Sequence, residues 1–312
     1  MINAMLALSL VLAGVPAGTE GTHIRYAVQR VCGEKACGKL RLVLADGSAH
    51  ELPDTSTGEG HEPVAVSADG SRVAYFRAGD RRLIAYELGG KRRFVGTVKQ
   101  PANEVGVDET RLLLSPDGSR LAYLPNDAGR RIRVYDVRSG RAVGTLPAED
   151  GFSCTAGFSG DGGELLRVEE SMLIAARVTD LRGSTLRRDV PPQVVAHNLP
   201  RWPSSVADGG GDDRPRVAAA AADGRRLAVY VPGERPSMIV YDLGSRKVTA
   251  RVPLPAGVRP AAATWTGTAE VTVRGDGGGM GRRVRVDLDE KRAEIVETYD
   301  RPAGGTVYHA GG

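Results

Sequence analysis

A sequence motif of roughly 40 to 50 residues recurs along this chain and limits its possible folds more than any other feature. The clearest copy runs from Ser115 to Leu146 and reads SPDGSRLAYLPNDAGRRIRVYDVRSGRAVGTL. Further copies begin at Ser67, Ser159 and Ala221, and a degenerate copy begins at Trp265. Each reads as strand, turn, strand, loop, strand, turn, strand, which is the pattern of a β-propeller blade.

Two turn signals within each copy support this interpretation. The first is Asp-Gly between two apolar runs, where Asp can bond to its own backbone and Gly supplies the positive φ of a tight hairpin. The second follows an alternating stretch such as Arg131–Tyr135, in which Ile132 and Val134 share one face. This second signal predicts six blades, because it occurs at Asp46, Glu87, Asp136, Asp180, Asp242 and Asp287.

The first turn signal occurs only five times, counting the degenerate Thr266-Gly267, because blade one lacks it. Propellers usually close by adding a terminal strand to an incomplete blade, which removes open sheet edges. We therefore predict that residues 306–310 form the innermost strand of blade one. The sequence thus predicts an all-β domain at 18–312 with six four-stranded antiparallel blades, at about 24–53 plus 306–310, 62–100, 106–147, 153–199, 215–253 and 260–298.

The N-terminal segment differs in kind from the repeat. Residues 1–17 hold no charge, and an apolar run at Ala4–Ala13 is followed by small residues near Ala17, as in a secretory signal peptide. The run is shorter than the roughly 18 residues that span a bilayer, so we expect cleavage and no stable membrane insertion. No Lys or Arg precedes the run, which leaves an uncleaved anchor or a misplaced start codon as alternatives.

Cysteine usage supports export. Cys32 and Cys37 flank a four-residue loop between two expected antiparallel strands, which can bring their Cα atoms within disulfide range. A metal site would need two further ligands, and the sequence has no second Cys pair. We expect the disulfide, in a secreted or extracytoplasmic protein, and expect Cys154 to be a buried small apolar residue.

The repeat also carries a family resemblance. Ser115–Tyr123, SPDGSRLAY, followed by Val134-Tyr135-Asp136 and Ser139-Gly140-Arg141, resembles the TolB-type propeller repeat of periplasmic and secreted bacterial proteins. The resemblance covers residues 62–147 well and 215–253 fairly. Six-bladed members of that family act as protein-binding scaffolds, so the resemblance implies a protein partner. A fold of this kind hosts many activities, so the motif specifies architecture more strongly than function.

Catalytic signatures are missing from the sequence. It has no Gly-x-Ser-x-Gly elbow and no His-Glu-x-x-His, and its five histidines show no ligand spacing. The glycine cluster Gly275–Gly281 lies between two β-runs and does not open a helix, so we expect a flexible hairpin loop there. We therefore assign no catalytic residue, no bound metal and no cofactor.

Charge distribution argues against a nucleic-acid partner. The net charge is +4, and the chain contains 42 Lys and Arg against 38 Asp and Glu. A nucleic-acid binder gathers its basic residues on one face, often with exposed aromatics. Here the basic doublets fall at different strand junctions, so we interpret them as solvent-facing strand ends, with weak attraction to an anionic cell-wall polymer as the alternative. The doublets are Arg81-Arg82, Arg92-Arg93, Arg130-Arg131, Arg187-Arg188, Arg225-Arg226 and Arg282-Arg283.

The blade pattern also predicts where a partner would bind. Loops between second and third strands, and between successive blades, emerge on one face of the ring, which we call the loop-rich face. Its longest irregular segment is the insertion loop 199–215, where Trp202 and Arg201 are candidate interface anchors. Trp202 could instead fold back over the channel or a blade. The binding candidates on this face are Arg201, Trp202, Asp212, Asp213, His61, Glu62, Asn103 and Glu104.

Two functions remain open at this stage. The first is a non-catalytic extracytoplasmic scaffold, expected to be a monomer, that binds a protein or cell-envelope component. The second is a propeller enzyme of the lactonase or lyase type, with a metal held by channel-facing groups. Convergent carboxylates at the channel mouth would favour the enzyme, and an apolar or arginine-rich mouth would favour the scaffold. The groups available for the metal are Glu62, Asn103, Glu104, Asp108 and Asp213.

Overall fold

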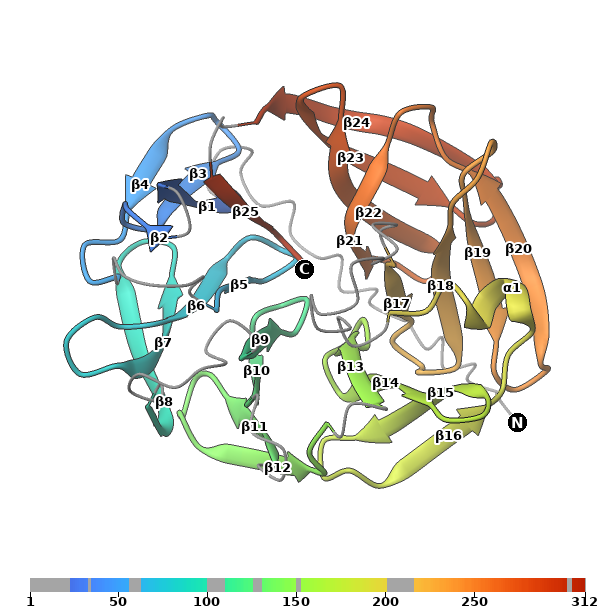
Figure 1. The fold of residues 1–312 in the computed structure, drawn as a ribbon, viewed down its shortest axis with the longest axis horizontal. Helices are drawn as coiled ribbons and strands as arrows, with labels where there is room; N and C mark the ends of the chain where they lie inside the picture. The colour runs from blue at the N-terminus through green and yellow to red at the C-terminus, as the bar shows by residue number, and fades with distance from the viewer. Residues whose placement is uncertain are drawn as a thin grey trace, which may run out of the picture.

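Six antiparallel sheets arranged around a central axis make up the protein (Figure 1). The computed structural model describes residues 23–32, 35–55, 63–99, 110–125, 131–149, 153–200, 216–301 and 305–311. One helical turn, α1 (Gln193–Ala196), is the sole α-helix among these residues. The predicted all-β, six-bladed propeller is therefore confirmed.

Blades two to six are each a meander of four strands in chain order. The first strand of each blade lies nearest the axis and the fourth lies on the perimeter (Figure 1). From blade two to blade six the strands are β5 (Ala65–Val66), β6 (Arg72–Phe76), β7 (Arg82–Glu87), β8 (Lys91–Lys99); β9 (Arg111–Leu114), β10 (Arg120–Leu124), β11 (Ile132–Asp136), β12 (Ala142–Leu146); β13 (Ser153–Phe158), β14 (Glu164–Glu170), β15 (Ile174–Asp180), β16 (Thr185–Asp189); β17 (Ala218–Ala220), β18 (Arg226–Val231), β19 (Ser237–Asp242), β20 (Lys247–Pro253); and β21 (Arg259–Trp265), β22 (Glu270–Gly277), β23 (Met280–Asp287), β24 (Arg292–Asp300).

Blade one combines the two ends of the described chain. Its strands β1 (Ile24–Cys32), β3 (Arg41–Leu44) and β4 (Ala49–Glu51) come from the N-terminal side, and a two-residue strand β2 (Lys35–Ala36) pairs with the end of β1. The innermost strand is β25 (Gly305–His309), which pairs antiparallel with β1 through the register Tyr26↔His309 and Val28↔Val307. Figure 1 shows β25 beside β1. The prediction that residues 306–310 close the ring is confirmed.

The Asp-Gly turns have the geometry that their residue types predict. In each, the aspartate Oδ1 accepts a hydrogen bond from the backbone N–H two residues later, at 2.9 Å for Asp69, 3.0 Å for Asp117 and Asp161, and 2.8 Å for Asp223. The glycine that follows has a positive φ between 56° and 72° in all four turns. Such turns are specified by residues four or fewer apart, and local contacts of this kind can be predicted from sequence.

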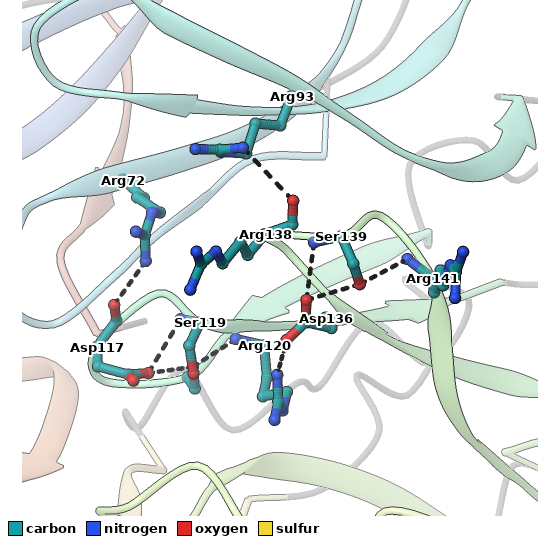
Figure 2. Close-up of polar contacts among 10 residues, drawn as sticks. Arg72, Arg93, Asp117, Ser119, Arg120, Asp136, Arg138, Ser139 and Arg141 are labelled. Carbon is teal, nitrogen blue, oxygen red and sulfur yellow. Dashed lines mark hydrogen bonds and ion pairs between the residues drawn. The ribbon is translucent and has the colours of Figure 1, made fainter.

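In every blade except blade two, the first aspartate of the second turn accepts a hydrogen bond from a backbone N–H of that turn. In blade three, Asp136 Oδ1 accepts hydrogen bonds from the backbone N–H and the hydroxyl of Ser139, at 2.8 and 2.7 Å (Figure 2). Its other oxygen pairs with Arg120 on the adjacent strand β10. These hydrogen bonds lower the pKa of Asp136 from its usual range, so the carboxylate is ionised at neutral pH. The two turns of a blade are therefore joined electrostatically.

Each junction between neighbouring blades holds a cluster of buried apolar residues, but the clusters differ greatly in size. The junction of blades five and six contains seventeen buried residues, from Val217 to Leu288. The junction of blades six and one, where the ring closes, contains three among the described residues: Tyr26, Val28 and Tyr299. Apolar burial is therefore weakest at the closure.

Polar groups supplement the apolar cluster at that junction. The Arg274 guanidinium is buried, 7 % exposed, and donates hydrogen bonds to the carbonyl oxygens of Ala310 (3.0 Å) and Ala68 (2.9 Å). These bonds join blade six to the segment after β25 and to the first turn of blade two. Arg25 of blade one pairs with Glu297 of blade six at 2.5 Å. Charge-assisted hydrogen bonds of this kind stabilise the junction and also restrict the orientation of the groups that they join.

A second group of buried polar residues surrounds β25. The His309 ring lies with Nδ1 3.4 Å from the Tyr299 hydroxyl and Nε2 3.7 Å from Asp276 Oδ1. Arg301 forms an ion pair with the other Asp276 oxygen at 2.8 Å. Burial is the main cause that lowers the pKa of His309, and the positive charges of Arg274 and Arg301 add to it against the opposing effect of Asp276. His309 is therefore neutral at pH 7.

The glycine cluster at 275–281 departs from its expected form. The expected hairpin is confirmed, but its loop is shorter than expected, because β22 and β23 run into the cluster and leave a two-residue turn at Gly278 and Gly279. Both glycines have positive φ, 61° and 82°, as a tight hairpin turn requires. A Cβ on Gly275 would lie 2.1 Å from the Arg259 carbonyl oxygen, so glycine there permits close pairing of β21 and β22.

We predict that Arg274→Met destabilises the protein, because it leaves two buried carbonyl oxygens at the closure without donors. The expected loss is about 3 kcal/mol, or about 6 to 12 °C in Tm for a chain of this size. Thermal unfolding followed by circular dichroism measures it. Arg251→Met, at an exposed position of β20, is the matched control and should leave Tm within about 1 °C. Equal Tm values for both variants would contradict the role assigned to Arg274.

We also predict that stability falls on mild acidification. The pKa of His309 in the folded protein lies below its ordinary value of 6.5, so below that pH the unfolded chain binds more protons and unfolding becomes more favourable, until pH reaches the lowered pKa. The loss is limited to about 1.4 kcal/mol per pH unit for one group. Urea unfolding at pH 7.5 and 5.5 should show that the free energy of unfolding falls less for His309→Asn than for the wild type.

The exposed His197 supplies the control for this experiment. His197→Asn should retain the wild-type loss of stability between the two pH values. Half-buried His23, whose pKa is also lowered mainly by burial, contributes equally to all three proteins. A His309→Asn variant as acid-sensitive as the wild type would refute the assignment to His309.

Candidate functional site

The central axis of the ring encloses a cavity of about 460 Å³. All six blades contribute to its wall, mainly through their innermost strands, so the cavity is the propeller channel. The described residues that line it are Pro63, Val64 and Ala68; Thr110 to Leu114 and Pro116; Cys154 and Ala156 to Phe158; Leu166; Pro200 and Arg216 to Ala220; Ala261 to Thr264; and Thr306, Tyr308 and Gly311.

The chemistry of the wall is apolar with isolated polar groups. Alanine side chains from blades two, four, five and six and leucines from blades three and four provide most of the lining. The polar groups include the threonines at 110, 264 and 306 and the guanidinium-bearing residues Arg111 and Arg216. No Asp or Glu contributes to the described part of the wall. A wall of this kind suits an uncharged or anionic segment better than a metal ion.

Arg111 is held in place by the neighbouring blade. Its guanidinium donates hydrogen bonds to the Thr155 carbonyl oxygen at 2.5 Å and to Cys154 Sγ at 3.4 Å. Behind it, Glu149 Oε2 lies 3.9 Å away, and that carboxylate also accepts a hydrogen bond from the Thr155 backbone N–H. Although burial opposes it, the interactions with Cys154 and Glu149 raise the pKa of Arg111, so its charge is permanent.

Cys154 lies on β13 in the channel wall and is 3 % exposed. It forms no disulfide, as expected from the sequence. Burial is the main cause that raises the pKa of its thiol, and the positive charge of Arg111 opposes this only in part. A protonated, buried thiol is a poor nucleophile, so Cys154 acts as a packing residue.

The other two cysteines are bonded to each other. Cys32, at the end of β1, and Cys37, just after β2, form a disulfide with a Cα–Cα distance of 5.6 Å. The predicted pairing is therefore present. It fastens the end of a small hairpin, because Val31↔Ala36 and Cys32↔Lys35 are the register pairs inside it.

The loop residues proposed as binding candidates all lie outside the described residues. This holds for His61, Glu62, Asn103, Glu104, Arg201, Trp202, Asp212 and Asp213, and for Asp108 of the alternative metal set. Within the described ranges, no group of three or more His, Cys, Asp or Glu could hold a metal ion. The candidate site that the structure does describe is thus the channel, with Arg111 as its most firmly positioned polar group.

Sequence reasoning did not single out Arg111 or Glu149. Their contact joins residues 38 positions apart in neighbouring blades, and it has no counterpart in the turn pattern of the repeat. The available signal was the position of Arg111 at the start of an otherwise apolar innermost strand, RLLL. In a propeller a charged residue at that position lies at the channel and requires a partner.

Comparisons with known proteins agree with this architecture. No family model matches the sequence, and no curated protein matches it. The crystal structure of TolB from Acinetobacter baumannii superposes with a TM-score of 0.52 and 14 % identity, covering 92 % of this chain. The chain folds as a TolB-like β-propeller. It spans 65 % of the TolB chain, and at this identity the likeness shows the fold alone.

A second solved structure is more distant. A chain of the mitotic checkpoint complex matches this TolB-like propeller with a TM-score of 0.45 and 12 % identity, over 97 % of this chain and 90 % of the other. A likeness at that level says nothing about function. Among the described residues, no helix of the propeller is both long and apolar enough to cross a bilayer.

We predict one titratable thiol in the oxidised, denatured protein and three after reduction, because Cys32 and Cys37 are bonded and Cys154 is free. A thiol assay in denaturant, on protein purified without reductant from an oxidising compartment, measures both values. Cys154→Ser is the control and should give no thiol before reduction. Three thiols in the oxidised wild type would show that the disulfide does not form.

Proposed function

We propose that this TolB-like propeller is a non-catalytic scaffold that binds a protein or cell-envelope partner through its loop-rich face. The observation that carries the proposal is the channel wall, which is apolar with arginines and has no carboxylate among its described residues. Such a wall offers neither ligands for a divalent ion nor a pair of titratable groups for acid–base chemistry. It is the kind of mouth that favours the scaffold over the lactonase or lyase alternative.

Exposed apolar side chains support the loop-rich face as the binding surface. Met172 is 100 % exposed and Leu173 is 63 % exposed, at the tip between β14 and β15 of blade four. Val190 and Val194, in the connection that follows β16, are also exposed. Successive strands run in opposite directions, so a second-to-third-strand loop and a blade-to-blade connection emerge on one face. Methionine and other large apolar groups in such positions are typical of protein interfaces.

The proposed interface also includes candidates identified from sequence alone. Trp202 and Arg201 belong to residue types that dominate interface free energy. The insertion loop that contains them, 199–215, follows directly on the segment that carries Val194 and α1. We place Asp212, Asp213, His61, Glu62, Asn103 and Glu104 on the same face as secondary contacts.

The proposed location is extracytoplasmic, with the propeller acting as a monomer. The disulfide between Cys32 and Cys37 supports this location, because such bonds persist in oxidising compartments. The apolar, uncharged run within residues 1–17 is consistent with export. A single chain supplies all six blades of the ring, so the fold needs no second copy to close.

We predict that Trp202→Ala reduces capture of the partner at least about tenfold, as expected for an interface anchor. The measurement is chemical cross-linking and affinity capture from the native cell envelope, with quantitative mass spectrometry of the recovered proteins. Arg251→Ala, on the perimeter strand β20, is the matched control and should capture as the wild type does. Equal recovery with Trp202→Ala would remove Trp202 from the interface, and no specific recovery by the wild type would count against the scaffold.

The alternative enzyme is tested on the same purified protein. Metal analysis and lactonase assays before and after chelation should both be negative if the propeller is a scaffold. Stoichiometric metal together with chelator-sensitive hydrolysis would overturn the proposal. The two experiments are independent, so a negative capture result does not by itself favour the enzyme.

A further inference from the structure

A groove of about 900 Å³ separates the outer parts of blades two and three. One wall is β8 of blade two, at Gly96 to Val98, and the other is the face of blade three formed by β10, β11 and β12. A hydrogen bond from the Gly96 backbone N–H to the Gly140 carbonyl oxygen, 2.9 Å, joins the two walls. The groove is therefore fixed by backbone contact between the blades.

Two arginines lie side by side within this groove. Arg131 directly precedes β11, and Arg133 is its second residue. Both are exposed and project from one face of the strand, whereas Ile132 between them is fully buried. Tyr135 follows on the same face and is buried, and burial raises its pKa against the opposing effect of Arg133. The groove thus presents two guanidinium groups beside a tyrosine ring.

No described carboxylate pairs with either arginine, in contrast with the corresponding strands of other blades. In blade four, Arg177 of β15 pairs with Glu169 at 2.6 Å, and in blade six, Arg283 of β23 pairs with Glu297 at 3.0 Å. The cross-strand neighbours of Arg133 are instead Tyr123 on β10 and Thr145 on β12. These strand neighbours supply hydroxyl groups without compensating the charge.

The two chain segments that border the groove are rich in basic residues. In sequence, residues 91–99 contain four Lys or Arg and no acidic residue, and residues 131–141 contain four Arg and a single carboxylate, Asp136. That carboxylate is already bonded to Arg120. Figure 2 shows Arg93 of blade two reaching the Arg138 carbonyl oxygen of blade three, at 3.4 Å, with Arg141 nearby. The basic residues of these two segments outnumber the acidic ones, and an excess of positive charge favours an anionic ligand.

We propose that this groove binds an extended acidic segment of a partner protein, with Arg131 and Arg133 receiving carboxylates at alternate positions. Residues i and i+2 of one strand are about 7 Å apart. An extended peptide has the same repeat, so Asp or Glu at every second position matches the two guanidinium groups. Arginine binds carboxylates bidentately, so the guanidinium group selects a carboxylate by its geometry as well as attracting its charge. The Tyr123 ring and Thr145 hydroxyl flank the path of the peptide between the two walls.

This inference does not depend on the proposed scaffold function. The groove lies between two blades and is lined by strand residues, whereas the proposed interface uses loops of one face. Either surface can therefore fail its test while the other stands.

Fluorescence anisotropy with a labelled peptide of alternating Asp and Thr tests the proposal on the full chain. We expect binding to the wild type that weakens with added salt, and no binding of the matched Asn-Thr peptide. The double variant Arg131→Gln/Arg133→Gln should weaken binding at least about tenfold. Arg251→Gln/Arg259→Gln removes the same charge at exposed positions of blades five and six and should change binding less than about twofold.

Circular dichroism and thermal unfolding establish that both double variants are folded. Hydrogen exchange with and without the peptide gives a second readout, in which protection should appear at β8 and β11. Three results would overturn the proposal: equal losses in the two double variants, no protection at β8 and β11, or displacement of the peptide by tripolyphosphate at equal concentration. Equal losses in the two double variants would indicate that the peptide is attracted to net charge alone. Displacement by tripolyphosphate would indicate a phosphate site in place of a peptide groove.

Discussion

The structure depends on the pairing of β25 with β1 and on the Arg274 bonds that hold this pair against blade six. Every other junction is made by strands that follow one another in the chain and share a large apolar cluster. The closing junction has three buried apolar residues and relies more on oriented polar contacts. Buried polar contacts are less favourable than apolar packing in free energy, but they tolerate fewer alternative arrangements. Here they join the segment after β25 to blade six and to the first turn of blade two.

The repeat permitted the number of blades and their strands to be predicted, because these follow from contacts among residues close in sequence. The hydrogen bonds of Asp69 and Asp117 to residues two positions away are of this kind. The turn signal missing from blade one indicated the closing strand. The channel wall could not be predicted in the same way. Arg111 meets Glu149 and Cys154 only because two blades pack together, and Tyr299 meets His309 only because the ring closes. Contacts between blades depend on the angle at which sheets pack, which no single repeat encodes.

The arginine doublets show a further limit of sequence reasoning. The doublets are alike in sequence, and we expected all of them at strand ends, but Arg187 and Arg188 lie within β16. These two have carboxylate partners, whereas Arg131 has none among the described residues. What distinguishes them is the residue that the neighbouring strand or blade places opposite, such as Glu164 or Glu169 in blade four. The repeat keeps the backbone constant and leaves these opposing positions free to vary. Differences in surface chemistry between blades can therefore arise without any change of fold.

The position of β25 has a consequence for biogenesis. The inner edge of β1 is unpaired from the moment it is synthesised until residue 309 has emerged, because its partner is the last strand of the chain described. During that interval most of the inner edge of blade one is open, since β2 covers only the end of β1, and open edges pair readily with other chains. Translation delivers the intervening blades at about 5 to 20 residues per second, so the edge is exposed for tens of seconds. A nascent chain of this design needs protection of its first blade until its last strand arrives.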